Sequence, residues 1–178
     1  MDLAEALRNY REKIVDKWVE YTLSTYASSA FFLKEKDKFA NPVGSTIRES
    51  LMQIFRLLEK NSDINEYKPS VERIIQIRAI QEFSPSQAVA PLNAVKHITR
   101  EFLAADKERA LCINDLYDFE FSVDLIVLAA FDKYMEFRER LYKTRIEEIK
   151  SGRSVLADSR CPSKMAEIPV VVEQSDKV

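Results

Sequence analysis

The stretch from Asn114 to Lys150 contains neither proline nor glycine, and this constrains the fold more than any other feature of the sequence. Asn114 is a typical helix N-cap, acidic residues follow it, and Lys150 stands at the end, an order that complements the helix dipole. A single helix over this stretch would be about 54 Å long. A compact body of about 150 residues is only roughly 38 Å across. We therefore expect the first half of this helix to lie in the core and the second half to project as a stalk.

The two halves of this helix differ in their apolar pattern. Residues 119–131 are apolar on nearly all sides, which predicts a central helix covered from several directions. Beyond them, Tyr134, Phe137 and Leu141 follow at steps of three and four residues, the spacing that a partner helix needs. We predict that these three side chains form the seam of a homodimer. The mixed charges around them either set the register of that dimer or serve solubility, and both interpretations stay open.

The remainder of the chain is typical of a helical domain of one piece. Its 178 residues include only two glycines, and hydrophobic residues make up 46%. We expect about five helices, with the others at 3–26, 42–58, 67–83 and 85–102, so that residues 1–150 form one all-α domain. Pro91 falls inside the fourth helix, where an interior proline favours a break and a separate short piece at 84–91. Residues 151–178 are expected to be a disordered tail.

Charge and hydropathy limit the partners of the chain. The net charge is −2 with both signs mixed, which argues against a nucleic-acid partner. The longest apolar run covers residues 125–131 and is far short of the ~20 residues of a membrane span. The amino-terminal residues do not resemble a signal peptide. We expect a cytoplasmic protein without a membrane partner.

The sequence contains no recognisable catalytic or metal-binding constellation. One histidine and two cysteines cannot supply the three or four ligands of a metal site, and two glycines cannot build a phosphate loop. His97 is the single candidate for a haem ligand. Its helical neighbours Asn93, Arg100 and Glu101 are polar, so we expect it to face solvent. The sequence therefore predicts no enzyme and no cofactor.

Three stretches carry a resemblance to a known family. They are Phe39-Ala40-Asn41-Pro42-Val43-Gly44, Arg78 to Ala88 with Ser84-Pro85-Ser86-Gln87, and Ala129 to Glu139. In Asn41-Pro42 and Ser84-Pro85 a capping residue precedes a proline suited to the first helical position, and Gly44 suggests close approach of another helix backbone. Together the three resemble the N-terminal sensory domain of RsbR/RsbRD-type co-antagonist proteins of bacterial stressosomes.

The resemblance implies a globin-like fold without haem, a dimer packed through the last helices, and a role in receiving a signal. In that family the last helix usually leads into a STAS domain, which we do not expect in this sequence. We therefore expect a sensory or regulatory domain that responds to a ligand or to an unknown downstream protein. Two alternatives stay open: a haem-binding or small-ligand-binding globin, and an accessory subunit whose apolar seam docks on an unrelated partner.

Overall fold

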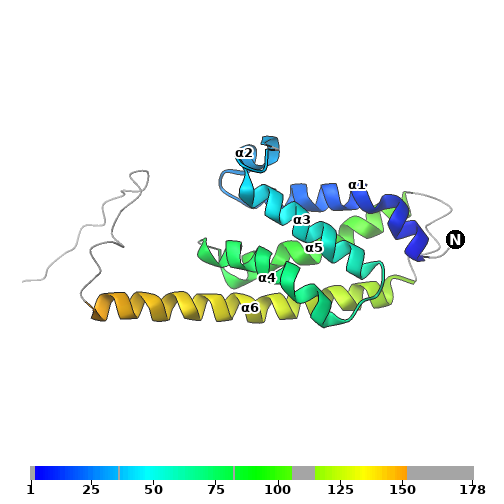
Figure 1. The fold of residues 1–178 in the computed structure, drawn as a ribbon. Helices are drawn as coiled ribbons and strands as arrows, with labels where there is room; N and C mark the ends of the chain where they lie inside the picture. Colours follow the sequence, from blue (N-terminus) through cyan, green and yellow to red (C-terminus); the bar gives the residue numbers. More distant parts are fainter. Residues whose placement is uncertain (1–2, 36, 82, 106–114, 152–178) are drawn as a thin grey trace, which may run out of the picture. The chain divides into compact units, whose positions relative to one another are not determined.

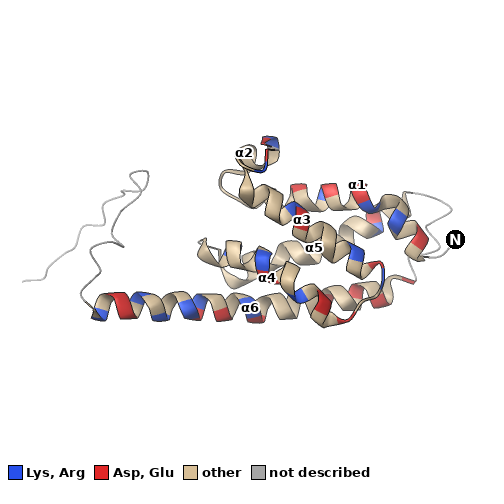
Figure 2. Ribbon diagram, in the orientation of Figure 1, with Lys and Arg blue, Asp and Glu red and all other residues tan. Residues whose placement is uncertain are grey.

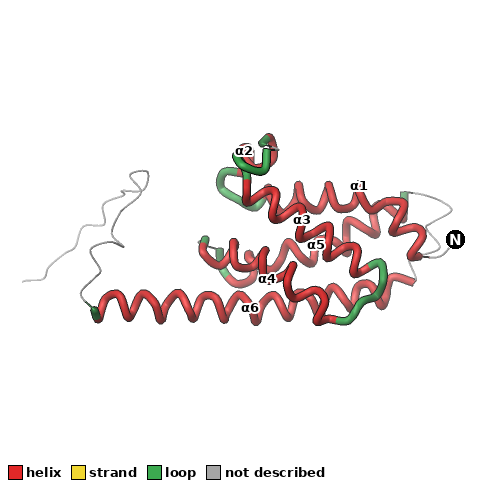
Figure 3. The backbone as a smooth tube through the Cα atoms, in the orientation of Figure 1, coloured by secondary structure: helices red, strands yellow, loops and turns green. Residues whose placement is uncertain are grey.

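The computed structural model describes residues 3–35, 37–81, 83–105 and 115–151. Across these residues the chain is helical, without a strand, which confirms the all-α prediction (Figure 1). Short loops join most of the helices (Figure 3). The helices are α1 (Leu3–Ser24), α2 (Ser29–Lys34), α3 (Pro42–Leu58), α4 (Ile64–Ile80), α5 (Pro85–Ala104) and α6 (Tyr117–Lys150). The chain divides into two units, 1–140 and 141–178, with α6 continuous from the first into the second.

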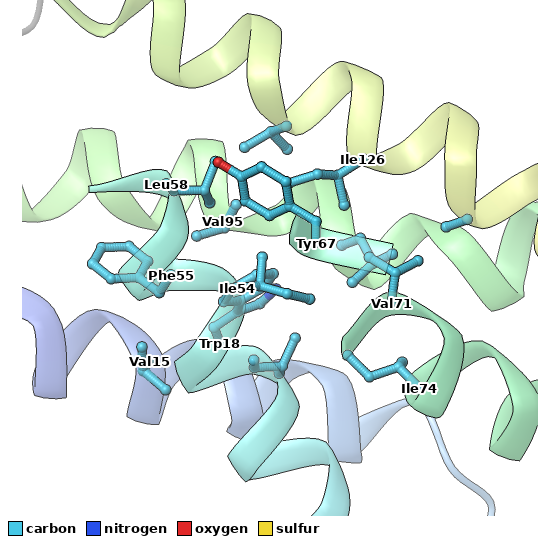
Figure 4. Packing of buried hydrophobic residues seen from close by; sticks show 14 of the residues in the cluster. Val15, Trp18, Ile54, Phe55, Leu58, Tyr67, Val71, Ile74, Val95 and Ile126 are labelled. Atoms are coloured by element: carbon cyan, nitrogen blue, oxygen red, sulfur yellow. The ribbon is translucent and has the colours of Figure 1, made fainter. Parts of the chain in front are cut away.

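The core of the first unit is built from one face of each long helix. Figure 4 shows Trp18 of α1, Ile54 and Phe55 of α3, and Tyr67 of α4 gathered with neighbouring aliphatic side chains. The Phe55 ring meets the Phe119 ring of α6 at a centroid distance of 6.2 Å. Trp18 is 1% exposed and anchors the core. Lys and Arg are interspersed with Asp and Glu along the helices (Figure 2).

The start of α3 is organised by Asn41. Its side-chain oxygen accepts the backbone N–H of Gly44 at 2.8 Å, as expected for an N-cap. Its amide nitrogen donates to the carbonyls of Phe32 and Glu35, at 3.0 and 2.9 Å, and so ties α2 to α3. A methyl group at Gly44 would first meet the side chain of Asn41, 2.8 Å from Cγ, whereas the expected close approach of another helix stays a prediction. Gly44 makes room for the cap.

Two helices begin or continue where the sequence suggested otherwise. α4 begins at Ile64 and not at Tyr67, because Asp63 and Glu66 form a capping box that outweighs Pro69 inside the helix. α5 begins at Pro85 with the expected cap, since Ser84 and Gln87 form a second capping box. The predicted break at Pro91 was wrong: α5 runs unbroken to Ala104.

α6 has one buried face. Phe119, Val123, Ile126, Ala130 and Tyr134 are buried, and the residues between them are largely exposed. The prediction of a helix covered on several sides was therefore wrong. Asn114, expected to cap this helix, lies outside the described residues, as does the tail from 152 onwards. α6 thus contributes one wall of the core, and its second apolar face is exposed among the described residues.

Candidate functional site

A buried arginine lies at the centre of the most connected polar cluster in the first unit. Arg78 of α4 is 0% exposed, which is rare for an arginine. Its Nε donates to the carbonyl of Ala88 at 2.9 Å, and its Nη2 donates to the carbonyl of Gln87 at 3.0 Å. Nη2 also donates to Oγ1 of Thr25 at 3.1 Å. One guanidinium therefore joins the end of α4, the beginning of α5 and the end of α1.

These contacts explain why α5 continues through Pro91. Proline has no backbone N–H, so the carbonyl of Gln87, four residues earlier, loses its helical donor. Nη2 of Arg78 donates to that same carbonyl. The carbonyl of Pro91 accepts Nε1 of Trp18 at 2.7 Å. Side chains of α4 and α1 thus donate hydrogen bonds to backbone carbonyls of α5 around the proline.

Aromatic rings enclose the guanidinium. Cζ of Arg78 lies 4.1 Å from the ring centre of Phe83 and 5.0 Å from that of Tyr26, distances typical of cation–π contacts. Burial lowers the pKa of Arg78, and the neighbouring Tyr26 partly offsets this. Burial raises the pKa of Tyr26, which the positive charge of Arg78 partly offsets. An arginine remains protonated under such shifts, so this cluster holds a permanent buried charge.

The cluster is attached directly to α6. The hydroxyl of Tyr134 donates to the carbonyl of Phe83 at 2.5 Å. Nη1 of Arg138 donates to the carbonyl of Ala79, in the last turn of α4, at 3.3 Å. Up to Arg140, α6 runs alongside α4 (Figure 1). Two carbonyls at the end of α4 and just beyond it therefore hold the middle of α6.

Two of the three residues predicted for a dimer seam, Tyr134 and Phe137, lie on this attached side. Tyr134 is 2% exposed and engaged with its own subunit. Phe137 is partly buried against the core, and Leu141 is 41% exposed. While this fold is kept, Tyr134 is not available to a second copy. The homodimer itself stays a prediction.

A different set of apolar residues lies exposed on the opposite face of α6. We call this set the outer stripe, and its members within the first unit are 36–75% exposed: Tyr117, Phe121, Leu125, Leu128, Phe131 and Met135. Phe121, Leu128 and Met135 recur at intervals of seven residues, the repeat of a helix that meets another helix. In the second unit Tyr142 and Ile149 continue this interval and are exposed.

His97 is placed as expected. Its side chain is 80% exposed on α5, and Nε2 lies 3.2 Å from a carboxylate oxygen of Glu101. A haem ligand needs a closed apolar pocket around the iron, and this position offers none. Among the described residues, no group of three or more His, Cys, Asp or Glu side chains is placed to hold a metal ion. No described helix is long and apolar enough to cross a membrane.

Comparison with known proteins identifies the family. Residues 12–149 match the family model described as the RsbT co-antagonist protein rsbRD N-terminal domain. This chain belongs to the RsbRD N-terminal domain family. No curated protein and no solved structure matches it.

The stretches that carry the family resemblance are those that build the cluster. Residues 78–88 supply Arg78, Phe83 and the capping box of α5, and residues 129–139 supply Tyr134 and Arg138. Residues 39–44 supply the Asn41 cap. Asn41 also holds the backbone of Phe32, whose ring contacts the Tyr26 ring at 5.3 Å. In this RsbRD N-terminal domain the recognisable residues are thus joined through one network.

Sequence reasoning missed Arg78 as the centre of this network. One feature of the sequence pointed to it. A helix that continues through an interior proline leaves the carbonyl four residues earlier without its helical donor, so a side chain elsewhere must supply one. Arginine, with five N–H donors, is the side chain best suited to supply one. The outer stripe was missed for another reason, because the apolar positions of α6 fit two faces equally well.

Proposed function

We propose that this chain is a sensory or regulatory domain without catalytic activity, which acts as a homodimer through the outer stripe of α6 in the cytoplasm. Membership of the RsbRD N-terminal domain family supports the sensory role. The single observation that carries the dimer is the outer stripe, a row of large apolar side chains on a helix whose other face is already buried.

The extent of the outer stripe fits an interface between two copies. A fully exposed large side chain offers about 150–200 Å², so its six members expose roughly 500–600 Å² per copy. Two copies would bury roughly 1,000–1,200 Å², which clears the minimum of about 1,000 Å² for a biological interface and corresponds to a weak or transient dimer. A patch of this size is at the upper end of what monomers expose, and patches at that end are often functional.

The mechanism would be a change in packing that reaches α6 through the Arg78 cluster. The rings of Phe32, Tyr26 and Phe83 are in successive contact, at 5.3 and 5.4 Å between centroids. The carbonyl of Phe83 then accepts the hydroxyl of Tyr134. A ligand or partner that favours one packing of these rings would shift the population of α6 positions. The downstream regulatory protein would bind the dimer differently in the two α6 positions.

The test is the solution mass of the full chain and two charge variants. We expect a dimer by light scattering for the unaltered chain. Leu128→Glu with Met135→Glu should give a helical monomer, because four carboxylates would be buried in the interface of a dimer. Ile80→Glu is the matched control, since Ile80 is an exposed large aliphatic residue of α4 outside the outer stripe. It should stay dimeric.

Other outcomes would contradict the proposal in distinct ways. A double variant that remains dimeric rejects the outer stripe as the interface. A monomeric unaltered chain that forms a stoichiometric complex with another protein, lost in the double variant, favours the accessory-subunit alternative. A Soret band on haem titration that disappears in His97→Ala favours the globin alternative.

A further inference from the structure

A groove lies where α1, α2 and α3 meet, away from the outer stripe. Its volume is about 730 Å³, within the range of about 300–1,000 Å³ typical of small-molecule sites. Val19 and Leu23 of α1 and Phe32 and Leu33 of α2 give it an apolar wall. Asn41 and Gly44 also line it, so the groove includes the cap that ties α2 to α3.

The charged side chains around the groove are unequally matched. Four acidic and two basic residues belong to the described lining. Both basic residues are already paired: Arg48 lies 2.5 Å from Asp16, and Lys38 lies 2.5 Å from Glu49. Among the described residues, no cation meets Glu20 or Glu35, although Glu35 accepts the backbone N–H of Asp37.

We propose that this groove binds a small amphipathic cation, a primary ammonium on an unbranched apolar chain. Glu20 and Glu35, which no described cation meets, would receive the ammonium, whose three N–H donors suit carboxylate oxygens. The apolar wall of Val19, Leu23, Phe32 and Leu33 would take the chain. An anion of the same length would meet the unpaired carboxylates and be repelled.

The groove also adjoins the contacts that lead to α6. Phe32 lines the groove, and its ring rests edge-on against Tyr26 at 5.3 Å. Tyr26 lies beside Arg78 and Phe83. A ligand pressing on Phe32 would therefore act on the cluster that holds Tyr134. This consequence rests on the proposed sensory function, whereas the binding of a cation does not.

Calorimetric titration of the full chain with octylammonium, below its micelle concentration, tests the site. We expect a single site that binds octylammonium at least tenfold more tightly than octanoate or octanol. Glu20→Gln with Glu35→Gln should weaken octylammonium at least fivefold, in keeping with the loss of two exposed charge contacts. Glu12→Gln is the matched control, an exposed carboxylate of α1 outside the groove, and should leave affinity unchanged.

A second variant separates the apolar contribution. Leu33→Ser should weaken octylammonium at least threefold while leaving the shorter butylammonium unchanged, because only the longer chain reaches the apolar wall. Equal affinity for octylammonium and octanoate, or full affinity in the Glu20/Glu35 variant, would overturn the proposal. Circular dichroism of each variant checks that the fold is kept.

The same samples distinguish this proposal from the sensory function. Amide NMR spectra with and without octylammonium report on Tyr134 and Met135. Binding without any shift on α6 leaves the cation site standing and rejects its coupling to the dimer. Absence of binding in a chain that is a stable dimer through the outer stripe overturns the cation site and leaves the proposed function standing.

Discussion

Replacement of Arg78 by methionine should reveal whether this side chain substitutes for the donor that Pro91 lacks. The change removes three hydrogen bonds, to Gln87, Ala88 and Thr25, and leaves the carbonyl of Gln87 without the donor that replaces the missing N–H of Pro91. Hydrogen bonds to a charged group contribute about 1.5–3 kcal/mol each. Relief of the burial cost of the charge offsets part of that sum. We expect a net loss of about 3 kcal/mol in the free energy of unfolding.

The decisive comparison is a double-mutant cycle with Pro91→Ala. Alanine at 91 restores a backbone N–H that can donate to Gln87, so the contact from Arg78 is needed less. Arg78→Met should then cost about 1–2 kcal/mol less in the Pro91→Ala background than in the unaltered chain. Interaction energies of that size are typical of residues that share a partner.

Urea denaturation measures all four free energies. Far-UV circular dichroism should be followed alongside the fluorescence of Trp18, the single tryptophan, and coincident transitions support two-state analysis. Because Trp18 donates to the carbonyl of Pro91, its emission reports directly on this region. If the destabilisation of the double variant equals the sum of the two single variants within about 0.5 kcal/mol, Arg78 does not replace the donor that Pro91 lacks.

Two further changes test the cap of α3 and the burial of Tyr67. Gly44→Ala should destabilise the domain by about 1–2 kcal/mol, because the methyl group would displace the Asn41 cap. At an ordinary helical glycine the same change would stabilise the helix, so a rise in the urea midpoint would contradict this prediction. Burial raises the pKa of Tyr67 to about 12, above its ordinary value of 10.0. The contribution of Tyr67 to the free energy of unfolding should therefore be complete below pH 10. Between pH 10 and 12 it should fall by up to roughly 2–3 kcal/mol, because Tyr67 ionises first in the unfolded chain. Tyr67→Phe should flatten that fall, measured by urea denaturation across the pH range, and an unaltered slope would reject the burial argument.

Local signals predicted the helix starts well where one signal acted alone. Asn41-Pro42 and Ser84-Pro85 begin α3 and α5 as expected, because each cap needs only residues within one turn. At α4 two local signals competed. Pro69 favoured a start nearby, while the reciprocal bonds of Asp63 and Glu66 place the start at Ile64.

Pro91 and Arg78 show where local reasoning must fail. The penalty for an interior proline is calculated for an isolated helix, in which nothing replaces the lost donor. Here the replacement comes from a residue on another helix, thirteen positions earlier in the chain. Neither residue alone predicts the other. Arginines are usually exposed and interior prolines usually break helices, and both of these rules ignore tertiary contacts. The two exceptions explain each other because both residues act on the carbonyl of Gln87.

The seam predicted on α6 depends on the same kind of tertiary contact. Periodicity identifies apolar faces, but it does not say which face the body of the domain covers. Tyr134 and Phe137 fit an outward seam as well as Phe121, Leu128 and Met135 do. The carbonyls of Phe83 and Ala79, at the end of α4 and just beyond it, decide between them by holding the side of α6 that carries Tyr134 and Arg138.

The two faces of α6 are mechanically linked, because residues of one helix turn together about its axis. Tyr134 faces the Arg78 cluster, while the next residue, Met135, belongs to the outer stripe. Neighbouring residues on a helix are about 100° apart, so a rotation that breaks the bond from Tyr134 to Phe83 must also carry Met135 sideways. Packed helices move in small discrete shifts rather than by continuous bending. Under the proposed function, a signal that alters the packing around Phe83 would change which side chains the outer stripe presents, so the proposal places the output of the domain on α6.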